Sequence, residues 1–485
     1  MKNYEHIAFD NFWPMVGSRN FFGPTETVRY SDLLGFHIYA DLRLNLDLAA
    51  AEDDAKAMKC VDLLEDYTAI ADRCAGLVGA RVLEVQGERI HFVLPAQDAM
   101  SDLAKLLLFS SALTQTIFQE LKPAAGDDWR GFSMAADHGP AVLIPSSYGG
   151  GSLVSLGIAA NKPAKKLGVG VDSGHLALPS RIGKSLPGAK TSGDWVEVDV
   201  KNLVAATKAF FDDKLTAGMR QAARVVLEER TRRGRRDFTR GMSESISFSQ
   251  TPLRARGMCL RADLDGFSKA VEDAFKNQKV PELVRQFSDI MQYPLEFAQK
   301  LGRQLIELPW AGDCCTILIQ PGSGETLDEM RATVPVEAGR CWHAVAYENG
   351  GNKRWNMSLG TAKWAVGLAC GDAEEGGDGQ AIITEFPAAG RTFRVIVGWC
   401  ARRAKDAQET SGIKGDDVVL PTIDHQNMEA VFKPLFELIG SNYRFSNYAK
   451  LKQAGHSAGK SLATSTVGHV AGISTALPAP RPYWR

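Results

Sequence analysis

The residues best suited to chemistry are two acidic turns that lie fifty positions apart. Asp263 ends an apolar run shortly before Gly266, a residue that lets the chain turn away. Asp313 follows a glycine between two β-rich runs, at the tip of an expected hairpin. An adjacent strand would carry its carboxylate next to Asp263. Together with the backbone carbonyl of Leu264, these carboxylates form an oxygen cage suited to Mg²⁺ or Mn²⁺.

Two divalent ions held there define the chemistry that the site would support. They would activate a sugar hydroxyl and neutralise a leaving pyrophosphate. Such ions complete their coordination with water and substrate phosphates. The expected cofactors are therefore two Mn²⁺ or Mg²⁺ ions.

The elements that must position these carboxylates occur twice along the chain. The first series is a strand in 33–48, a helix in 55–78, a hairpin in 81–94, a helix in 101–121, a strand in 131–137 and a helix beginning near 159. The second series is a strand in 257–267, helices to 301, a hairpin in 304–320 and strands in 364–370 and 394–399 before a short helix. This long-period duplication predicts an α/β (α+β) protein with two related domains.

The predicted organisation has four parts. Residues 33–205 form a first domain, 206–256 a helix and a basic, Ser-rich linker, 257–420 a second domain, and 421–485 a C-terminal helix with a flexible tail.

Composition excludes several classes of protein. Lys and Arg number 56 against 57 Asp and Glu, so there is no whole-chain charge that would attract nucleic acid or anionic lipid. The eight cysteines include no C-x-x-C pair, which predicts reduced, buried thiols. The start of the chain has neither the basic region nor the apolar region of a signal peptide, and no apolar run is long enough to span a membrane. We expect a cytoplasmic protein.

The acidic motifs resemble those of class III adenylate and guanylate cyclases. In that family the first metal motif has the form Asp-x-x-Gly-Phe-Ser/Thr, and the second is Gly-Asp on a hairpin. Asp263 with Gly266-Phe267-Ser268 matches the first, and Gly312-Asp313 matches the second. The resemblance implies two tandem cyclase-type domains, each a mostly antiparallel sheet flanked by helices, with the active site at the domain interface.

In the family, the domain opposite the metals supplies an asparagine and, four residues later, an arginine for the transition state. The stretch from Gly157 to Lys165 resembles that motif, which implies Asn161 and Lys165 as the catalytic pair. Lysine keeps the positive charge but lacks the planar, bidentate fork of arginine.

The complementary site departs from the family pattern. The second half has Arg402 and Asp406 where the asparagine and arginine would stand. The first half keeps Asp41 but has Glu88 at the hairpin position. We therefore expect one working site, with metals from the second half and Asn161 from the first.

Base selection in the family depends on two residues at positions that hold Glu84 and Val154 here. A Glu84 carboxylate would accept a hydrogen bond from uracil N3–H or guanine N1–H, whereas adenine N1 and cytosine N3 are themselves acceptors. Uracil and guanine both stay open. Lys190, in a turn before a strand, is a further candidate for contact with the triphosphate.

The tandem arrangement with divergent motifs most resembles the pyrimidine cyclases of the bacterial Pycsar anti-phage system, and among them the uridylate cyclases. That resemblance implies a lyase that converts UTP to cyclic UMP and pyrophosphate, with Mn²⁺ favoured. It also implies a homodimer and a separate effector protein that binds the cyclic nucleotide. The alternatives are a guanylate cyclase and a non-catalytic, cyclase-like module that senses a nucleotide.

Overall fold

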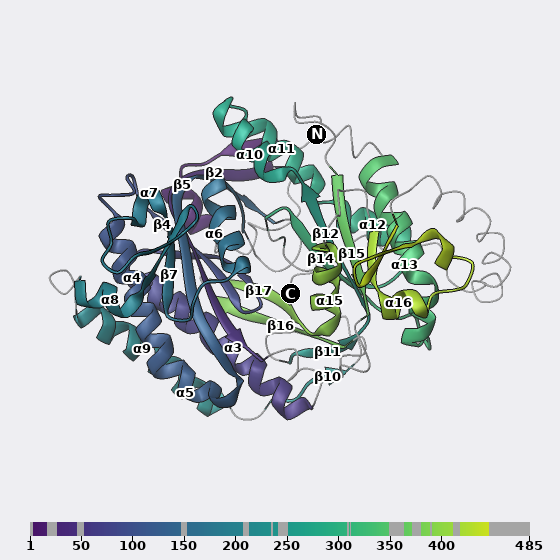
Figure 1. Ribbon diagram of the computed structural model, residues 1–485, viewed down its shortest axis with the longest axis horizontal. Helices are drawn as coiled ribbons and strands as arrows, with labels where there is room; N and C mark the ends of the chain where they lie inside the picture. Colours follow the sequence, from purple (N-terminus) through teal and green to yellow (C-terminus); the bar gives the residue numbers. More distant parts are fainter. Residues whose placement is uncertain are drawn as a thin grey trace.

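The chain folds into two halves that lie side by side (Figure 1). The structure is a computed structural model, and it describes residues 3–16, 27–45, 53–146, 153–206, 213–233, 236–240, 251–307, 310, 312–348, 363–370, 380–388, 390–410 and 418–445. Each half has its own sheet and its own helices.

The first half is built on a 9-stranded sheet in the order β3-β4-β2-β5-β7-β9-β8, with β1 beside β2 and β6 beside β5. Its strands are β1 (Asn3–His6), β2 (Thr27–Leu44), β3 (Arg81–Gln86), β4 (Arg89–Pro95), β5 (Trp129–Pro145), β6 (Leu153–Leu156), β7 (His175–Pro179), β8 (Lys190–Ser192) and β9 (Trp195–Asp199). Most neighbours are antiparallel, while β5 and β7 run parallel. Along β2, Phe36 and Ile38 point into the main core, which places Tyr39 on the opposite face.

Helices cover both faces of this sheet. They are α1 (Phe9–Val16), α3 (Asp54–Leu77), α4 (Leu103–Thr116) continued by a π-helical turn (Ile117–Leu121), α5 (Lys122–Ala125), a 3-10 turn (Gly126–Asp128), α6 (Ile158–Val169), α7 (Ser180–Gly183), α8 (Val200–Ala206) and α9 (Asp213–Arg233). The Asp53 side chain starts α3 by accepting a hydrogen bond from the Lys56 amide. Leu167 of α6 packs against Tyr39, on the sheet face opposite Phe36.

The second half repeats the same topology. Its 7-stranded sheet has the order β13-β14-β12-β15-β18-β20-β19, which matches the first sheet strand for strand, and β15 and β18 run parallel as β5 and β7 do. The strands are β12 (Met258–Asp265), β13 (Leu305–Glu307), β14 (Cys314–Ile319), β15 (Lys363–Ala369), β18 (Val418–Pro421), β19 (Glu437–Ile439) and β20 (Asn442–Phe445). The internal duplication is thus a duplication of fold.

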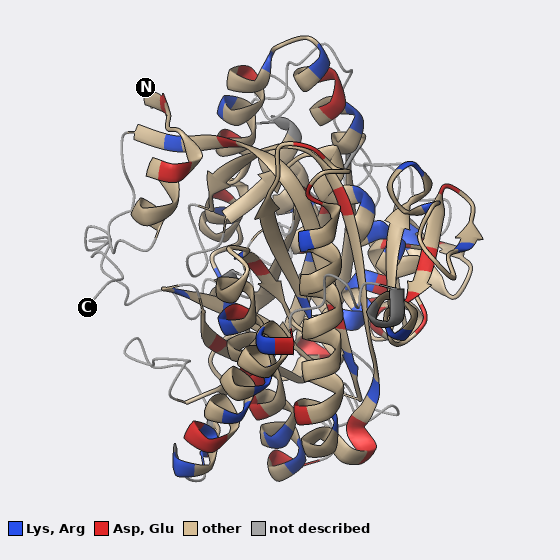
Figure 2. Cartoon of the chain, turned by 90° about the vertical axis from the view of Figure 1, so that its left-hand side faces the viewer, with Lys and Arg blue, Asp and Glu red and all other residues tan. Residues whose placement is uncertain are grey.

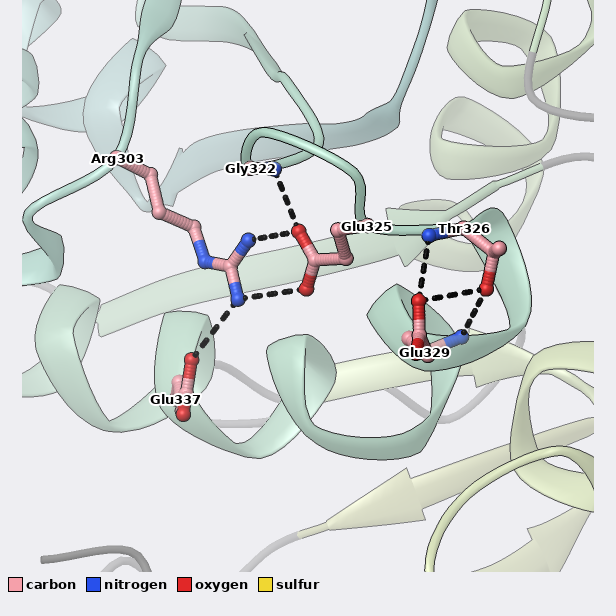
Figure 3. Close-up of polar contacts among 6 residues, drawn as sticks. All are labelled: Arg303, Gly322, Glu325, Thr326, Glu329 and Glu337. Atoms are coloured by element: carbon pink, nitrogen blue, oxygen red, sulfur yellow. Dashed lines mark hydrogen bonds and ion pairs between the residues drawn. The ribbon is translucent and has the colours of Figure 1, made fainter. Parts of the chain in front are cut away.

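The helices of the second half flank this sheet. They are α10 (Phe267–Lys276), α11 (Val280–Ile290), α12 (Tyr293–Leu301), α13 (Leu327–His343) with a π-helical turn (Ala344–Glu348), α15 (Trp399–Gln408), α16 (Thr422–Gln426) and a 3-10 turn (Lys433–Leu435). Figure 3 shows why α13 begins where it does: Thr326 and Glu329 form a reciprocal capping box. Beside it, Arg303 binds Glu325 and Glu337 and fixes the loop before the helix.

A third, 4-stranded sheet joins the halves, in the order β10-β11-β16-β17. Its strands are β10 (Thr239–Arg240), β11 (Leu253–Arg256), β16 (Gln380–Ala388) and β17 (Arg391–Val397). The predicted 206–256 stretch therefore contains helix α9 and two strands, and β11 pairs with β16 over its whole length. The expected tail from 446 onward lies outside the described residues.

Each half contributes an apolar hairpin to the core of the other half. Phe386 and Phe393 of β16 and β17 are buried in the core of the first half, together with Leu64 of α3. Conversely, Ile144 of β5 and Leu156 of β6 are buried in the core of the second half. Burying each such side chain contributes about 2 kcal/mol. The relative position of the halves is therefore set by core packing.

The distribution of charged residues and cysteines can be compared with the expectations from composition. Lys and Arg are interspersed with Asp and Glu along the helices facing the viewer in Figure 2. The eight cysteines are free and buried, which confirms the expectation of buried thiols without disulfides. Among the described residues, no helix is both long enough and apolar enough to cross a membrane.

Candidate active site

The two predicted metal carboxylates meet on adjacent strands. Asp263 on β12 lies directly opposite Cys314, the first residue of β14, so Asp313 is one position away from it. Gly312 makes the turn before β14 with a φ of 61°, in the left-handed region that favours glycine. The predicted pairing of Asp263 with Asp313 is thus present in the fold.

Electrostatics at this pair favour a cation. Burial, together with the neighbouring Asp263, raises the pKa of Asp313 well above its ordinary value. Like charges held this close repel each other, and a divalent ion between them would relieve that repulsion. The Leu264 side chain is buried in the core, so the oxygen that this residue could supply is its backbone carbonyl.

The donor set fits a hard divalent ion that shares its coordination with substrate. Within the described part of the chain, no group of three or more His, Cys, Asp or Glu side chains could hold a metal. Mg²⁺ at phosphate sites is usually held by one or two carboxylates, with water and phosphate oxygens completing its coordination, and Asp263 and Asp313 supply two carboxylates.

Helix α6 brings the first half to this pair. Its start can approach β5 because Gly157 has no side chain: a Cβ there would lie 2.6 Å from the Ala141 Cβ. Asn161 Nδ2 and Lys165 Nζ, one helical turn apart, both donate to Ser268 Oγ at 3.4 Å. Ser268 belongs to the Asp263 motif of the second half.

Two further relations place α6 at the carboxylates. A Cβ added to Gly312 would lie 3.8 Å from Asn161 Oδ1. The Lys165 cation is close enough to Asp313 to lower the pKa of that carboxyl, against the larger effect of burial. The structure therefore brings Asn161, Lys165, Asp263 and Asp313 together within one chain.

Sequence reasoning missed a fourth charged group at this site. Arg261 lies two positions before Asp263 on β12, so both side chains point to the same face of the sheet. Burial lowers the pKa of Arg261, but Cys314 and Asp263 raise it by more, so the pKa lies above its ordinary value. The alternation of side chains along a strand could have revealed Arg261, because residues two positions apart lie on the same face of the sheet.

Glu84 is buried, although sequence reasoning treats it as a carboxylate. It is 2% exposed, and its Oε1 has no hydrogen-bond partner among the described residues. Burial raises the pKa of Glu84 to about 8, against the effects of Gln86 and Arg89. Near neutral pH the group is therefore largely a neutral acid, which can donate as well as accept a hydrogen bond.

The surroundings of Glu84 are aromatic and apolar. His91 lies opposite it on β4, and the His91 ring stacks on Tyr39 with centroids 4.1 Å apart. Strand β3 contacts β6, which carries Val154. Val154 is fully buried among the apolar residues of the second half's core, so its role in base selection stays a prediction.

Lys190 is placed at the margin of the first sheet. It lies exposed on edge strand β8, opposite Glu197 of β9. Glu197 in turn binds Lys166 of α6 at 2.6 Å. Lys190 therefore lies one strand away from a side chain that binds α6, and its contact with a triphosphate stays a prediction.

The carboxylates of the complementary site are engaged within the first half. Arg89 binds Asp41 at 3.2 Å and also donates to the carbonyl of Ala164 in α6. Glu88 Oε1 accepts the amide hydrogen of Leu44. Internal partners therefore occupy the groups that would hold metal on this side.

Comparison with known structures identifies the architecture. A class III adenylyl cyclase-like ATP-binding protein from Pseudomonas aeruginosa superposes with a TM-score of 0.70 and 18% identity, over 93% of this chain and 95% of that one. The fold is that of a class III cyclase-like protein. The match extends over both halves, so the tandem arrangement itself is shared.

Single cyclase domains give much lower scores. The guanylyl cyclase Cya2 and the adenylyl cyclase CyaB from P. aeruginosa each have a TM-score of 0.27 and 13% identity, covering 34% and 40% of this chain and 90% and 93% of theirs. At this score, the two matches do not bear on the fold of the whole chain. No model of a known protein family matches the sequence, and no curated protein sequence matches it.

In this cyclase-like fold, the sequence-based prediction of the architecture is confirmed: two mostly antiparallel sheets flanked by helices, with the candidate site at their interface. The structure also answers a question that sequence leaves open. Asn161 and Ser268 of the same chain are in contact, so the halves face each other within one polypeptide.

Proposed function

We propose that this chain is a nucleotidyl cyclase that converts a nucleoside triphosphate to its 3′,5′-cyclic nucleotide and pyrophosphate. The observation that carries the proposal is the contact of Asn161 and Lys165 with Ser268, beside the Asp263–Asp313 pair. An amide and a cation from one half thus lie beside two carboxylates from the other.

Each residue has a role in the proposed reaction. The 3′-oxygen bonds to the α-phosphorus, the bond from that phosphorus to the bridging oxygen breaks, pyrophosphate leaves with the electron pair, and the hydroxyl proton passes to water. Asp263 and Asp313 would hold two Mn²⁺ or Mg²⁺ ions, which would supply Lewis-acid stabilisation. Asn161 orients the ribose, and Lys165 stabilises the charge that develops on the α-phosphoryl oxygens.

UTP is the proposed substrate, cyclic UMP the product, and anti-phage signalling through a separate effector protein the proposed role. This rests on the sequence resemblance and on Glu84. The neutral acid of Glu84 can accept from N3–H of uracil and donate to the adjacent carbonyl. Guanine presents the same N–H and carbonyl pattern, so a guanylate cyclase is the alternative within this class. A homodimer stays a prediction, and the proposed site is complete in one chain.

A second function is supported by a specific observation, the lysine at position 165. Lys165 reaches Ser268 but cannot grip an α-phosphoryl group with two parallel hydrogen bonds, as arginine would. The whole-length structural neighbour is described as an ATP-binding protein. A module that binds a triphosphate without turning it over is therefore the second candidate.

One experiment separates these functions. The purified protein is incubated with ATP, GTP, CTP and UTP separately, with Mn²⁺ and with Mg²⁺, and products are identified by mass. Cyclic UMP from UTP alone supports the main proposal, while cyclic GMP would move the substrate to GTP. Tight binding of a non-cyclisable triphosphate, without product from any nucleotide, would replace the cyclase by the binding module.

A further inference from the structure

The side chain of Arg391, a residue of the second half, is buried in the first half. Arg391 lies at the start of β17, and its guanidinium donates to the backbone carbonyl of Leu83 at 3.2 Å and to that of Val82. The residue is 6% exposed. A charged side chain of one half is therefore buried against the β3 backbone of the other.

The two carbonyls belong to an irregular part of β3. The register between β3 and β4 shifts between Val82 and Glu84, so the regular ladder is interrupted at Leu83. A bulge leaves backbone groups without ladder partners, and a buried carbonyl without a donor is costly. Arg391 supplies the donors at this point.

The residue that follows the bulge is Glu84. Its backbone position depends on how the bulge is held, because a bulge re-aims the side chain next to it. Its Oε1 is buried without a partner in the described part of the chain, which leaves that oxygen for a ligand. Arg391 therefore acts on the backbone one residue before the proposed base reader.

Arg391 is itself held rigidly. Its guanidinium lies 4.6 Å from the ring centre of Phe393 and 5.4 Å from that of Trp13 in α1. Burial lowers the pKa of Arg391 to about 9, while Asp72 raises it. A buried charge is weak evidence for stability, so the contact of Arg391 with the β3 carbonyls is the feature that needs an explanation.

We propose that Arg391 is a positioning residue for base selection: by holding the carbonyls of Val82 and Leu83, it directs the Glu84 carboxyl toward the base. This inference rests on the proposed function, in which the base lies against Glu84. It makes base selection a joint property of both halves, because the bulge lies in the first half and its support in the second.

The test measures base discrimination in binding. Dissociation constants are determined calorimetrically for 3′-deoxy-UTP and 3′-deoxy-CTP, which lack the attacking hydroxyl, with Mn²⁺ and at a pH above 8. The variants are Glu84→Gln, Arg391→Met, their double mutant, and Phe393→Leu, which loosens the guanidinium without removing it. Arg394→Met is the matched control, because Arg394 lies on the same strand and pairs with Glu385 inside the hairpin.

We expect Glu84→Gln and Arg391→Met each to lower the UTP-to-CTP ratio by about tenfold, and the double mutant to lower it no further. Phe393→Leu should lower the ratio by a smaller factor, and Arg394→Met should leave it unchanged. Arg391→Lys should restore part of the ratio, since one ammonium can still donate to a carbonyl.

The inference is overturned if Glu84→Gln lowers the ratio while Arg391→Met does not, or if their effects add. If the Arg391→Met variant does not fold, the Phe393→Leu variant provides the test. An unchanged UTP-to-CTP ratio in that variant also overturns the inference. A wild-type protein that binds neither analogue would instead refute the proposed function. The two failures are thus distinguishable.

Discussion

Arg89 stands opposite Asp41 in the first half, at the place where Cys314 stands opposite Asp263 in the second. In the first half this pairing creates an ion pair of 3.2 Å, whereas in the second it leaves the carboxylate facing another carboxylate. Two sheets of the same topology therefore present opposite electrostatics at equivalent positions. The strand pairing is the same in both halves, so this difference comes from residue type, Arg89 in one half and Cys314 in the other.

The first prediction concerns this asymmetry. Asp263→Ala and Asp313→Ala each remove one of two carboxylate ligands, so turnover should fall by at least about 100-fold and Mn²⁺ binding should be lost. Asp41→Ala removes a carboxylate that Arg89 neutralises, and should change turnover by less than about threefold. Product formation and calorimetric titration with Mn²⁺ check both. An equal loss at Asp41 would mean that the metals belong to the other half.

The second prediction concerns the Asn161 amide and the Lys165 ammonium of α6. Asn161→Ala and Lys165→Ala should each lower kcat by about 100-fold, with a smaller effect on KM, because both act on charge that develops in the transition state. Lys165→Arg should raise kcat, since arginine supplies two parallel donors. Lys162→Ala, an exposed position on the same helix, serves as the control. A large rise in KM with unchanged kcat at Lys165 would assign that residue to binding alone.

The third prediction is a pH dependence of base discrimination. The pKa of Glu84 is raised to about 8, so the neutral acid dominates below that pH and the carboxylate above it. The acid can donate to cytosine N3, whereas the carboxylate can accept only from N–H groups such as uracil N3–H. Preference for UTP over CTP should therefore increase as pH rises through 8.

Initial rates or binding constants for the two nucleotides across this pH range would measure the effect. The Glu84→Gln variant has no carboxyl to ionise, so its preference should stay flat. Burial lowers the pKa of His91, which lies opposite Glu84, well below its ordinary value, and raises the pKa of Tyr39 well above its own, so neither group changes charge in this range. The pKa of Arg391, about 9, does fall near this range, and Glu84→Gln separates its effect because that variant keeps Arg391. A wild-type preference that does not vary with pH would remove Glu84 from base selection.

The fourth prediction concerns Arg261. This half-buried cation lies on the same face of β12 as Asp263 and also lowers the pKa of Asp313. Arg261→Met should therefore strengthen Mn²⁺ binding in the absence of nucleotide by a few-fold up to about tenfold, because the negative potential at the carboxylates increases. It should weaken triphosphate binding for the same reason. Calorimetric titration of each ligand tests this, and weaker Mn²⁺ binding in the variant would contradict it.

Local sequence patterns were sufficient to predict that Asp263 and Asp313 lie close together and that Asn161 and Lys165 share one side of a helix. Asp263 and Asp313 sit at strand ends marked by glycine, and the register of an antiparallel pair brings such ends together. Asn161 and Lys165 are four positions apart, so a helix necessarily puts them on one side. In both cases the geometry depends on neighbours along the chain or on one strand pairing.

The features that escaped sequence reasoning depend on distant parts of the chain. Arg391 meets Leu83 across 308 positions, and no local pattern announces such a contact. Glu84 reads as an ordinary strand glutamate, but its burial, and hence its protonation, is set by the surrounding strands and aromatic rings. The third sheet was likewise missed, because β11 and β16 pair from segments more than one hundred positions apart.

The exchange of hairpins has a consequence for how this protein could have diverged from a symmetric ancestor. Because Phe386 and Phe393 complete the core of the first half, and Ile144 and Leu156 that of the second, neither half keeps its interior without the other. Covalent fusion holds them at a one-to-one ratio and a high effective concentration. Each half is then released from having to recognise its own copy, and a mutation in one is no longer imposed on both. One half can lose its metal ligands and the other its asparagine without loss of the single site that remains.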